Sequence, residues 1–467
     1  MSMKMLNETG ESRYEEMRKG HTIFKAVSFT ARIFLILLYF GAAAQVMAEI
    51  WGDRFLAVTL LYVVVLEIFQ ALMEAGNIRQ RRILDLVYGQ FFAALCTNVL
   101  FGLLLWTISA QDAGSLFWEF LLLTLLESFT GILWAAFSFT LYLRKQTWKQ
   151  ALYVYGDREN WARTVKENNS RNGYFHISKA VSYKEGISFI EKILPKYQAL
   201  FLGVLPDKER NLLLKAGISK DRECYLVPGI ADIYLQNSRV IRLHDKVLFS
   251  SGRGFLTREQ ERVKRAEDIL FALLLLIPSL PLMALISLCI KAEDGGPVFY
   301  RQERVTQYGR SFSMLKFRSM VQEAEKDGPQ LAAKHDARIT RTGKILRNLH
   351  LDELPQLFNV LAGQMSMVGP RPERREFIED YSRIIPEFRE RLRVKGGLTG
   401  YAQIYGKYST GPEDKLKYDL IYIYNYSLRL DIRLLFLTVR IFFQKENAQG
   451  VEEDTQRQEE QENKIKE

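Results

Sequence analysis

The sequence predicts a membrane protein built from an α-helical bundle of four spans, an α/β Rossmann-like module, and a mixed α/β domain with a re-entrant membrane helix. Three observations predict this architecture. Four apolar segments, each close to the roughly 20 residues that span a bilayer, lie in the first third of the chain. Strand-like and helix-like runs then alternate at short spacing. A fifth apolar run, interrupted by two prolines, precedes a basic region of mixed pattern.

The composition is compatible with this architecture. The chain has 467 residues, of which 48% are hydrophobic and 25% are charged, and these values exclude wholesale disorder. A mean hydropathy of −0.10 does not argue against a membrane protein, because an average hides segregated segments. The three cysteines are scattered and lack zinc-ligand spacing, which excludes a disulfide framework and indicates a reducing compartment.

The predicted bundle covers residues 27–143 and follows a basic segment, residues 1–26, that we expect in the cytoplasm. One apolar segment could be a buried soluble helix, but four in succession indicate membrane spans. Lys and Arg concentrate before the first span, after the second and after the fourth, so both ends of the bundle are expected in the cytoplasm. The four segments are 27–48, 55–73, 86–109 and 116–142, and the acidic residues that interrupt them or lie at their ends include Glu67, Glu74 and Glu127.

Residues 150–255 are predicted to form the Rossmann-like module with a mostly parallel sheet. A dinucleotide site needs several glycines in the first strand turn, so that the backbone can approach the pyrophosphate, and here only Gly156 is present. The sequence therefore favours a structural or regulatory module over a cofactor site. The strand-like runs are 151–155, 173–178, 198–204 and 223–227.

The fifth apolar run, residues 269–290, contains Pro278 and Pro281 near its centre. Each proline lacks an amide donor and clashes with the preceding turn, so we expect a break or a sharp kink. Two interpretations stay open. A re-entrant helix keeps the following residues in the cytoplasm, whereas a kinked fifth span puts them outside. Further on, residues 420–443 suit an interfacial or a core helix, and residues 445–467 are predicted to be a disordered charged tail.

Two adjacent carboxylates, Asp352 and Glu353, form the densest candidate site. Pro355 is tolerated only in the first turn of a helix, so the sequence predicts a helix that begins near Asp352. Neighbouring helical residues point about 100° apart, so one carboxylate could attack while the other holds a cation or moves a proton. The simpler alternative is an ordinary helix cap with an acidic first turn.

The surrounding motifs favour a phosphate site over the simple cap. Arg371 lies between two prolines, and a rigid guanidinium suits bidentate phosphate recognition. Lys316 and Arg318 add cations, and a glycine-rich loop at 396–407 could approach a ligand closely. Carboxylates, fixed cations and a membrane-dipping segment together predict phosphoryl chemistry on an amphiphile. Nucleic acid is not an expected partner, because the chain contains no recognisable nucleic-acid module.

Residues 262–444 closely resemble the bacterial sugar transferase family, the monotopic polyprenyl-phosphate hexose-1-phosphate transferases. The whole chain is similar to the large subgroup, whose members carry four membrane helices and a Rossmann-like module in front of the catalytic domain. The motifs that carry the resemblance are Lys264-Arg265 through Asp268, Lys316-Phe317-Arg318-Ser319-Met320, Leu351-Asp352-Glu353-Leu354-Pro355-Gln356-Leu357, Gly369-Pro370-Arg371-Pro372 and Thr399-Gly400-Tyr401-Ala402-Gln403.

The resemblance implies an enzyme that transfers a sugar-1-phosphate from a nucleoside-diphosphate sugar, with UDP expected, to undecaprenyl phosphate. The transfer releases a nucleoside monophosphate and initiates exopolysaccharide, capsule or O-antigen synthesis. The implied location is the inner leaflet of the bacterial cytoplasmic membrane, with the soluble domains in the cytoplasm. The resemblance leaves open a homo-oligomer, the identity of the sugar, the pathway and any ligand of the Rossmann-like module.

The resemblance also implies residue roles. Asp352 matches the nucleophile that forms a covalent phosphosugar intermediate, and Glu353 matches the carboxylate that binds Mg²⁺. The matching phosphate-binding positions are Arg347, Arg371, Lys316 and Arg318, the matching nucleotide-sugar loop contains Gln403 and Lys407, and the membrane helix break falls at Pro278 and Pro281.

The chain departs from the family pattern at several positions. Leu280-Pro281 replaces a Ser-Pro, His350 replaces a serine, and Gly396-Gly397-Leu398-Thr399-Gly400-Tyr401 replaces Pro-Gly-Ile-Thr-Gly-Trp, so sugar specificity cannot be carried over. An alternative function from another class is a membrane sensor or scaffold of polysaccharide export with a degenerate catalytic domain. Release of a nucleoside monophosphate distinguishes the enzyme from the scaffold.

Overall fold

The structure is a computed structural model that divides into two compact units, Met1–Val227 and Pro228–Glu467. The predicted N-terminal segment 1–26 and the predicted tail 445–467 lie outside the residues that the structure describes. The described residues are 33–45, 55–73, 75–76, 83–108, 113–145, 149–156, 161–170, 175–251, 255–321, 338–406 and 411–442.

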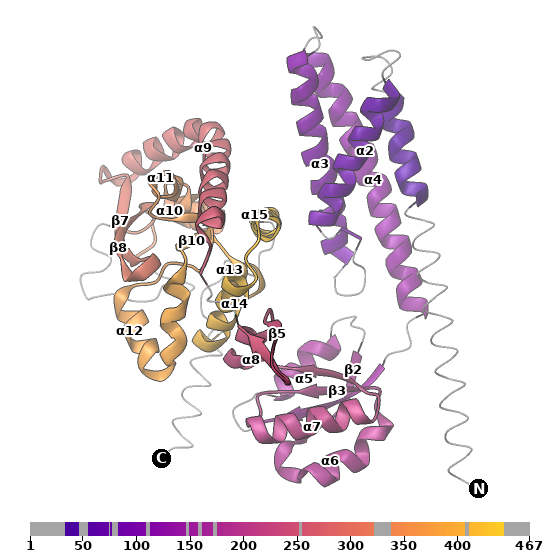
Figure 1. Ribbon diagram of the computed structural model, residues 1–467. Helices are drawn as coiled ribbons and strands as arrows, with labels where there is room; N and C mark the ends of the chain where they lie inside the picture. Colours follow the sequence, from indigo (N-terminus) through magenta and orange to yellow (C-terminus); the bar gives the residue numbers. More distant parts are fainter. Residues whose placement is uncertain are drawn as a thin grey trace. The chain divides into compact units, whose positions relative to one another are not determined.

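The first unit contains a bundle of long apolar helices that lie side by side (Figure 1). Three of them are long and apolar enough to cross a membrane, in agreement with the second, third and fourth predicted spans. The described part of the first predicted span, Ile33–Gln45, is a shorter apolar helix. The three long helices are α2 (Phe55–Leu72), α3 (Ile83–Ile108) and α4 (Ala113–Lys145).

A polar cluster lies inside this bundle. Glu127 of α4 is buried, and its carboxylate accepts hydrogen bonds from Tyr62 Oη at 2.8 Å and from Asn98 Nδ2 at 3.0 Å. Tyr62 Oη also lies 2.6 Å from Asn98 Oδ1, and Tyr39 donates to the Glu127 carbonyl at 2.9 Å. The acidic residue that interrupts the fourth predicted span therefore faces the neighbouring helices of the bundle.

The first unit also contains a four-stranded parallel sheet in the order β2-β1-β3-β4. Strands and helices alternate along the chain as the sequence predicted, and apolar side chains are buried on both faces of the sheet. The strands are β1 (Lys149–Tyr155), β2 (Phe175–Ser182), β3 (Ala199–Leu202) and β4 (Glu223–Leu226), and the helices are α5 (Trp161–Ser170), α6 (Ile187–Ile193) and α7 (Asp207–Ser219).

Gly156 directly follows β1, at the turn where a dinucleotide site would need its glycines. A Cβ atom at this position would lie 1.9 Å from the carbonyl oxygen of Val204, well inside van der Waals contact. The glycine is therefore required by the close approach of the chain after β3, and it needs no ligand to explain it. This geometry fits the structural interpretation of Gly156.

The division between the two units falls after Val227, inside the region 150–255 that the sequence predicted as one module. The segment that follows packs on the second unit, where the rings of Tyr234 and Tyr424 lie 5.1 Å apart and Asn237 Nδ2 donates to the Tyr424 carbonyl at 3.3 Å. This segment contains α8 (Ile230–Leu235) and the antiparallel hairpin β5 (Arg239–Leu243) and β6 (Lys246–Ser250).

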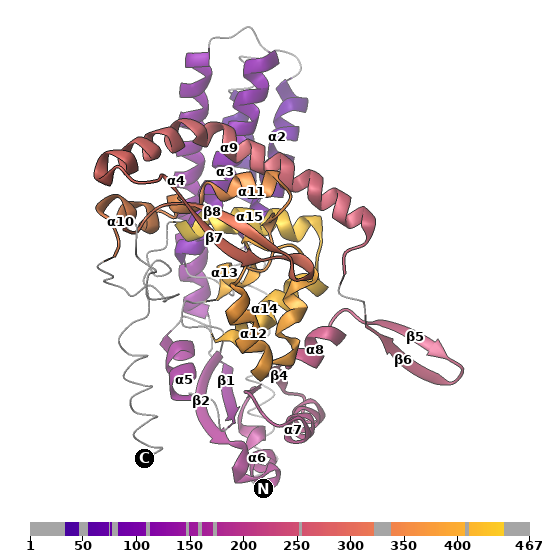
Figure 2. The ribbon, with the colours of Figure 1, turned by 90° about the vertical axis from the view of Figure 1, so that its left-hand side faces the viewer.

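The fifth apolar run lies within α9 (Arg258–Asp294), which is also long and apolar enough to cross a membrane. The helix contains both Pro278 and Pro281 and changes direction partway along its length (Figures 1 and 2). The helix therefore continues past both prolines instead of ending at them. Beside them, Ser279 Oγ donates to the Leu276 carbonyl at 2.9 Å.

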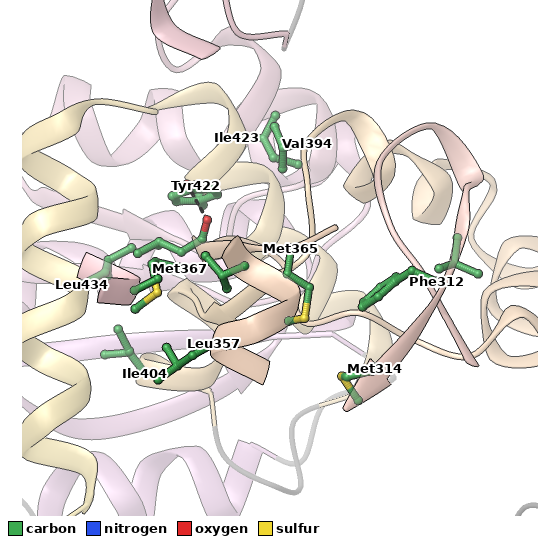
Figure 3. Close-up of a cluster of buried hydrophobic side chains, with 14 of the residues drawn as sticks. Phe312, Met314, Leu357, Met365, Met367, Val394, Ile404, Tyr422, Ile423 and Leu434 are labelled. Carbon is green, nitrogen blue, oxygen red and sulfur yellow. Dashed lines mark hydrogen bonds between the residues drawn. The ribbon is translucent and has the colours of Figure 1, made fainter. Parts of the chain in front are cut away.

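The second unit is held together by one large apolar core (Figure 3). Leu357 of α11, Met367 of β9 and Leu434 of α15 meet there, together with residues of α9. The other elements of this unit are β7 (Phe299–Val305), β8 (Ser311–Phe317), α10 (Arg341–Asn348), α11 (Gln356–Leu361), β9 (Ser366–Val368), α12 (Arg375–Ile384), β10 (Gly397–Thr399), α13 (Tyr401–Tyr405), α14 (Pro412–Tyr424) and α15 (Leu428–Phe442).

Candidate active site

The two adjacent carboxylates lie on a short 3₁₀ turn, Leu351–Glu353, rather than in the first turn of an α-helix. His350 enters the turn in the left-handed region with φ of 53°, and α11 begins only at Gln356. The expectation of a helix that begins near Asp352 is therefore wrong by several residues. The turn is possible here because Pro355, which lacks an amide donor, separates it from α11.

Two cations meet one oxygen of Glu353. Lys316 Nζ of β8 lies 3.2 Å from Glu353 Oε1, and Arg371 Nη2, from the loop after β9, lies 2.6 Å from the same atom. Burial alone would raise the pKa of Glu353, but Arg371 and Lys316 outweigh burial and hold that pKa well below its ordinary value. In return, Glu353 raises the pKa of Arg371. Glu353 is therefore a carboxylate that stays ionised.

Asp352 has a different environment from its neighbour. Its side chain is buried, and it accepts no hydrogen bond from any residue in the part of the chain that the structure describes. Burial and the nearby charge of Glu353 raise the pKa of Asp352, and the charges of Lys316, Arg347 and His350 oppose that rise only in part. The turn thus carries two unlike carboxylates. Glu353 is ionised and its charge is balanced by Lys316 and Arg371, whereas Asp352 has a raised pKa and no hydrogen-bond donor among the described residues.

The other predicted phosphate-binding arginines are engaged elsewhere. Arg347 Nε donates to Ser319 Oγ at 3.0 Å, and its charge reaches Asp352 without a direct contact. Arg318 is buried and forms an ion pair with Asp294 at the end of α9. Among the described residues, the contacts of Arg318 therefore tie β8 to α9, and they do not bring this side chain to the two carboxylates.

The glycine-rich loop is only partly described. Gln403 Nε2 donates to the Leu398 carbonyl at 3.0 Å, while Lys407 lies outside the described residues. Cβ atoms at Gly397 and Gly400 would each lie 2.1 Å from main-chain atoms of Gly369. These glycines allow the loop to pack against the segment that carries Arg371, which is a structural reason for the pattern.

The residues present fit a magnesium ion. Mg²⁺ in phosphate-handling sites is commonly held by one or two carboxylates together with substrate phosphates and water. Asp352 has no fixed partner among the described residues, and the cations contact only Oε1 of Glu353. The described part of the chain contains no group of three or more metal-binding side chains, so the remaining ligands would have to come from substrate and water.

The buried pair Arg391 and Asp419 near this site was not foreseen from the sequence. Arg391 lies in the 3₁₀ segment Pro386–Arg393, whose many charged residues are typical of a solvated face, and Asp419 lies in α14. Both side chains are almost fully buried, and their closest nitrogen and oxygen atoms are 2.9 Å apart. No local sequence pattern distinguishes this pair from exposed charges.

Comparison with known proteins identifies the class to which this site belongs. A family model described as bacterial sugar transferase matches residues 259–445, the region that contains α9 and both carboxylates. A UDP-glucose:undecaprenyl-phosphate glucose-1-phosphate transferase of Caulobacter vibrioides is 40% identical over 193 residues, which is 40% of this chain and 71% of that protein. The chain therefore belongs to the bacterial sugar transferase family.

Two further relatives each match part of the chain. A UDP-N-acetylgalactosamine-undecaprenyl-phosphate N-acetylgalactosaminephosphotransferase of Aeromonas hydrophila is 44% identical over 181 residues, covering 38% of this chain and 43% of that protein. A UDP-glucose:undecaprenyl-phosphate glucose-1-phosphate transferase of Xanthomonas campestris pv. campestris is 41% identical over 229 residues, covering 47% of each chain. The chain thus spans less than half the length of these two relatives.

Proposed function

We propose that this protein transfers a sugar-1-phosphate from a UDP-sugar to undecaprenyl phosphate. In the first step, a carboxylate oxygen of Asp352 attacks the phosphorus next to the sugar, and the bond to the nucleoside monophosphate breaks. In the second step, a phosphate oxygen of undecaprenyl phosphate attacks the same phosphorus and releases Asp352. The products are a nucleoside monophosphate and an undecaprenyl-diphosphate sugar, and two easier displacements replace one difficult one.

The single observation that carries this proposal is the unequal pair of carboxylates on the 3₁₀ turn. Glu353 is neutralised by Lys316 and Arg371, whereas Asp352 has a raised pKa and no fixed partner among the described residues. A more basic carboxylate is the better nucleophile, and its cationic surroundings reduce the repulsion that an approaching diphosphate would otherwise meet. The names of the relatives support the donor and acceptor classes.

Asp352 and Glu353 would hold Mg²⁺, which when bound neutralises diphosphate charge and orients the leaving group. Arg371 and Lys316 would bind phosphate oxygens in exchange for part of their contact with Glu353. Arg347 would add a longer-range positive charge. Arg318, Gln403 and Lys407 stay predictions for substrate contact.

We propose that α9 is re-entrant rather than a crossing span. Near its start, Lys264 pairs with Asp431 of α15, and near its end Asp294 pairs with Arg318 of β8. Core residues from both halves of the helix, from Ala272 to Ile290, pack in the same unit. A helix that crossed a bilayer would separate its ends by about 30 Å of hydrocarbon, so two attachments to one soluble body favour a helix that enters and returns.

The proposed location is the bacterial cytoplasmic membrane, with the soluble parts in the cytoplasm. The distribution of Lys and Arg around the predicted spans supports this orientation. The Rossmann-like module is proposed to be structural or regulatory, because Gly156 is explained by packing against Val204. In the cell, the reaction would initiate exopolysaccharide, capsule or O-antigen assembly.

Purified protein in lipid nanodiscs, a panel of UDP-sugars and undecaprenyl phosphate test the reaction. We expect nucleoside monophosphate release, and a covalent phosphosugar adduct in intact-protein mass spectra when the lipid acceptor is omitted. Asp352→Asn should lower the rate by about 1,000-fold or more and abolish the adduct. An active Asp352→Asn variant would exclude Asp352 as the nucleophile, and no nucleotide release with any sugar would favour the scaffold alternative.

A further inference from the structure

We infer that Arg391, held by Asp419, is a positioning residue for Arg371, the cation that contacts Glu353. This inference rests on the proposed function. The Arg391 and Asp419 side chains are 5% and 1% exposed, and their ion pair measures 2.9 Å. Because the desolvation of two charges offsets much of their attraction, such a pair adds little net stability. What the pair contacts is therefore more informative than its own strength.

The guanidinium of Arg391 reaches the main chain of Arg371. Arg391 Nη2 donates to the Arg371 carbonyl at 3.0 Å, and Nη1 lies 3.9 Å from Glu373 Oε1. The guanidinium also lies 4.9 Å from the centre of the Phe388 ring. Since Asp419 and Phe388 fix the plane of the guanidinium, the direction of the bond to Arg371 is fixed as well.

Other groups hold the neighbouring carbonyls of the loop. Among the described residues, Arg391 is the group that holds the carbonyl of Arg371 itself. Loss of the Arg391 side chain would therefore loosen this position while the rest of the loop stays attached. The neighbouring bonds are Tyr422 Oη to Val368 O at 3.1 Å, Gly397 N to Pro370 O at 2.9 Å, Arg304 Nη1 to Pro372 O at 3.4 Å and Val305 N to Glu373 O at 2.9 Å.

The contact between Arg371 and Glu353 is short, so it depends on the backbone position that the Arg391 bond holds. Arg371 Nη2 lies 2.6 Å from Glu353 Oε1. The side chain of Arg371 is 45% exposed, so packing contacts do little to fix its position. A displacement of about 1 Å in an active site can cost roughly 100-fold in rate. Arg391 thus positions Arg371 through its backbone carbonyl, without itself contacting Asp352 or Glu353.

Arg391→Lys separates this role from general stability. A lysine keeps the positive charge opposite Asp419, so no buried carboxylate is left without a cation. It lacks the planar guanidinium that lies beside the Phe388 ring and places its Nη2 atom between Asp419 and the Arg371 carbonyl. Arg393→Lys is the matched control, because Arg393 lies in the same 3₁₀ segment and pairs with Glu390, away from the loop.

A double-mutant cycle tests the inference in the full-length protein. Arg391→Lys should lower kcat/KM for nucleoside monophosphate release by about 10-fold, but by less than about 2-fold when Arg371 is already lysine. Arg393→Lys should change kcat/KM by less than about 2-fold in either background. Equal losses from Arg391→Lys in both backgrounds, or no loss at all, would show that Arg391 does not act through Arg371.

Hydrogen–deuterium exchange gives a readout that does not need activity. In Arg391→Lys, the amides of residues 369–373 should exchange at least about 3-fold faster, while the bundle and the α/β module stay unchanged. The Arg393→Lys control should leave this loop at the wild-type rate. Unchanged exchange in Arg391→Lys overturns the inference even if the wild-type protein releases no nucleotide, an outcome that would by itself refute only the proposed reaction.

Discussion

Two glutamates in this protein are held in opposite ways. Glu127, inside the helical bundle, accepts hydrogen bonds from the neutral groups of Tyr62 and Asn98. Glu353, in the second unit, is contacted by the cations Lys316 and Arg371. Both side chains are largely withdrawn from solvent, so the difference lies in the charge of the partners and not in the degree of burial alone.

The difference shows what each site can do. Neutral donors satisfy a polar group and join helices, as Tyr62 of α2 and Asn98 of α3 do for Glu127 of α4. Cations can exchange one anion for another, so Lys316 and Arg371 can pass from a carboxylate to a phosphate without losing a partner. The same change, Glu to Gln, should therefore be severe at Glu353 and mild at Glu127.

Glu353→Gln is expected to have the largest effect. The amide cannot neutralise Lys316 and Arg371, so the two cations repel each other, and the proposed magnesium site loses a charged ligand. We expect the rate of nucleoside monophosphate release to fall by about 1,000-fold. A rate within 10-fold of wild type would contradict the role proposed for Glu353.

Arg371→Met should have the next largest effect. The change removes the guanidinium and keeps a side chain of similar reach, so Glu353 is left with Lys316 alone. We expect kcat/KM for the UDP-sugar to fall by about 100-fold. Arg383→Met is the control, because Arg383 is exposed and pairs only with Asp380 of the same helix among the described residues, so its loss should change kcat/KM by less than about 2-fold. Equal losses in the two variants would contradict a specific role for Arg371.

The cation-held glutamate should also set a pH dependence of stability. The pKa of Glu353 is held well below the ordinary value of 4.5, so its ion pairs stabilise the fold at every pH above that value. Their contribution is lost as the pH falls through the lowered pKa. In an Asp352→Asn background, which removes the titration of the neighbouring carboxyl, the difference in Tm between Glu353 and Glu353→Gln should thus stay constant from about pH 8 to pH 5 and shrink only at more acidic pH. A difference that disappears by about pH 6 would argue against these ion pairs.

Substitutions at Glu127 should have the smallest effects. Tyr62 has a single hydroxyl proton and faces oxygens of both Asn98 and Glu127, so a donor at position 127 completes the set of bonds. Glu127→Gln supplies that donor and should change the free energy of unfolding by less than about 0.5 kcal/mol, whereas Glu127→Leu should cost about 1–2 kcal/mol. Unfolding of both variants in mixed detergent micelles measures the difference. Equal costs would show that the hydrogen bonds are not what holds this position.

The sequence predicted which residues form the site better than it predicted which of them contact one another. Asp352, Glu353, Lys316 and Arg371 come together because each lies in a short motif whose chemistry is visible locally. Arg318 carries the same charge as Lys316 two residues away, yet it pairs with Asp294 of α9. Which of these two cations faces Glu353 depends on tertiary packing, and a local motif does not contain that information.

Prediction of the fold from the sequence was limited in the same way, because local patterns do not specify tertiary contacts. Hydropathy located three of the long bundle helices, and strand–helix alternation located the parallel sheet, because both are periodic along the chain. The chain divides after Val227, and the segment that follows α8 contacts residues of the second unit almost 190 positions later, such as in the bond of Asn237 to Asn425, which no local sequence pattern indicates. A break or kink in α9 was expected, whereas its attachment to one unit at both ends required the structure.

The packing of α9 has a consequence for how this protein is made. Ala272, Leu276, Met283, Ile286 and Ile290 of this helix complete the core of the second unit, while other leucines of the same helix, such as Leu274 and Leu288, remain exposed. If α9 enters the membrane as proposed, lipid covers the exposed leucines and the rest of the unit covers the buried face. Because the buried face is also apolar, lipid could cover it before the unit folds. Folding of the second unit onto α9 would then displace lipid from that face, so on this proposal the bilayer takes part in the folding of the unit.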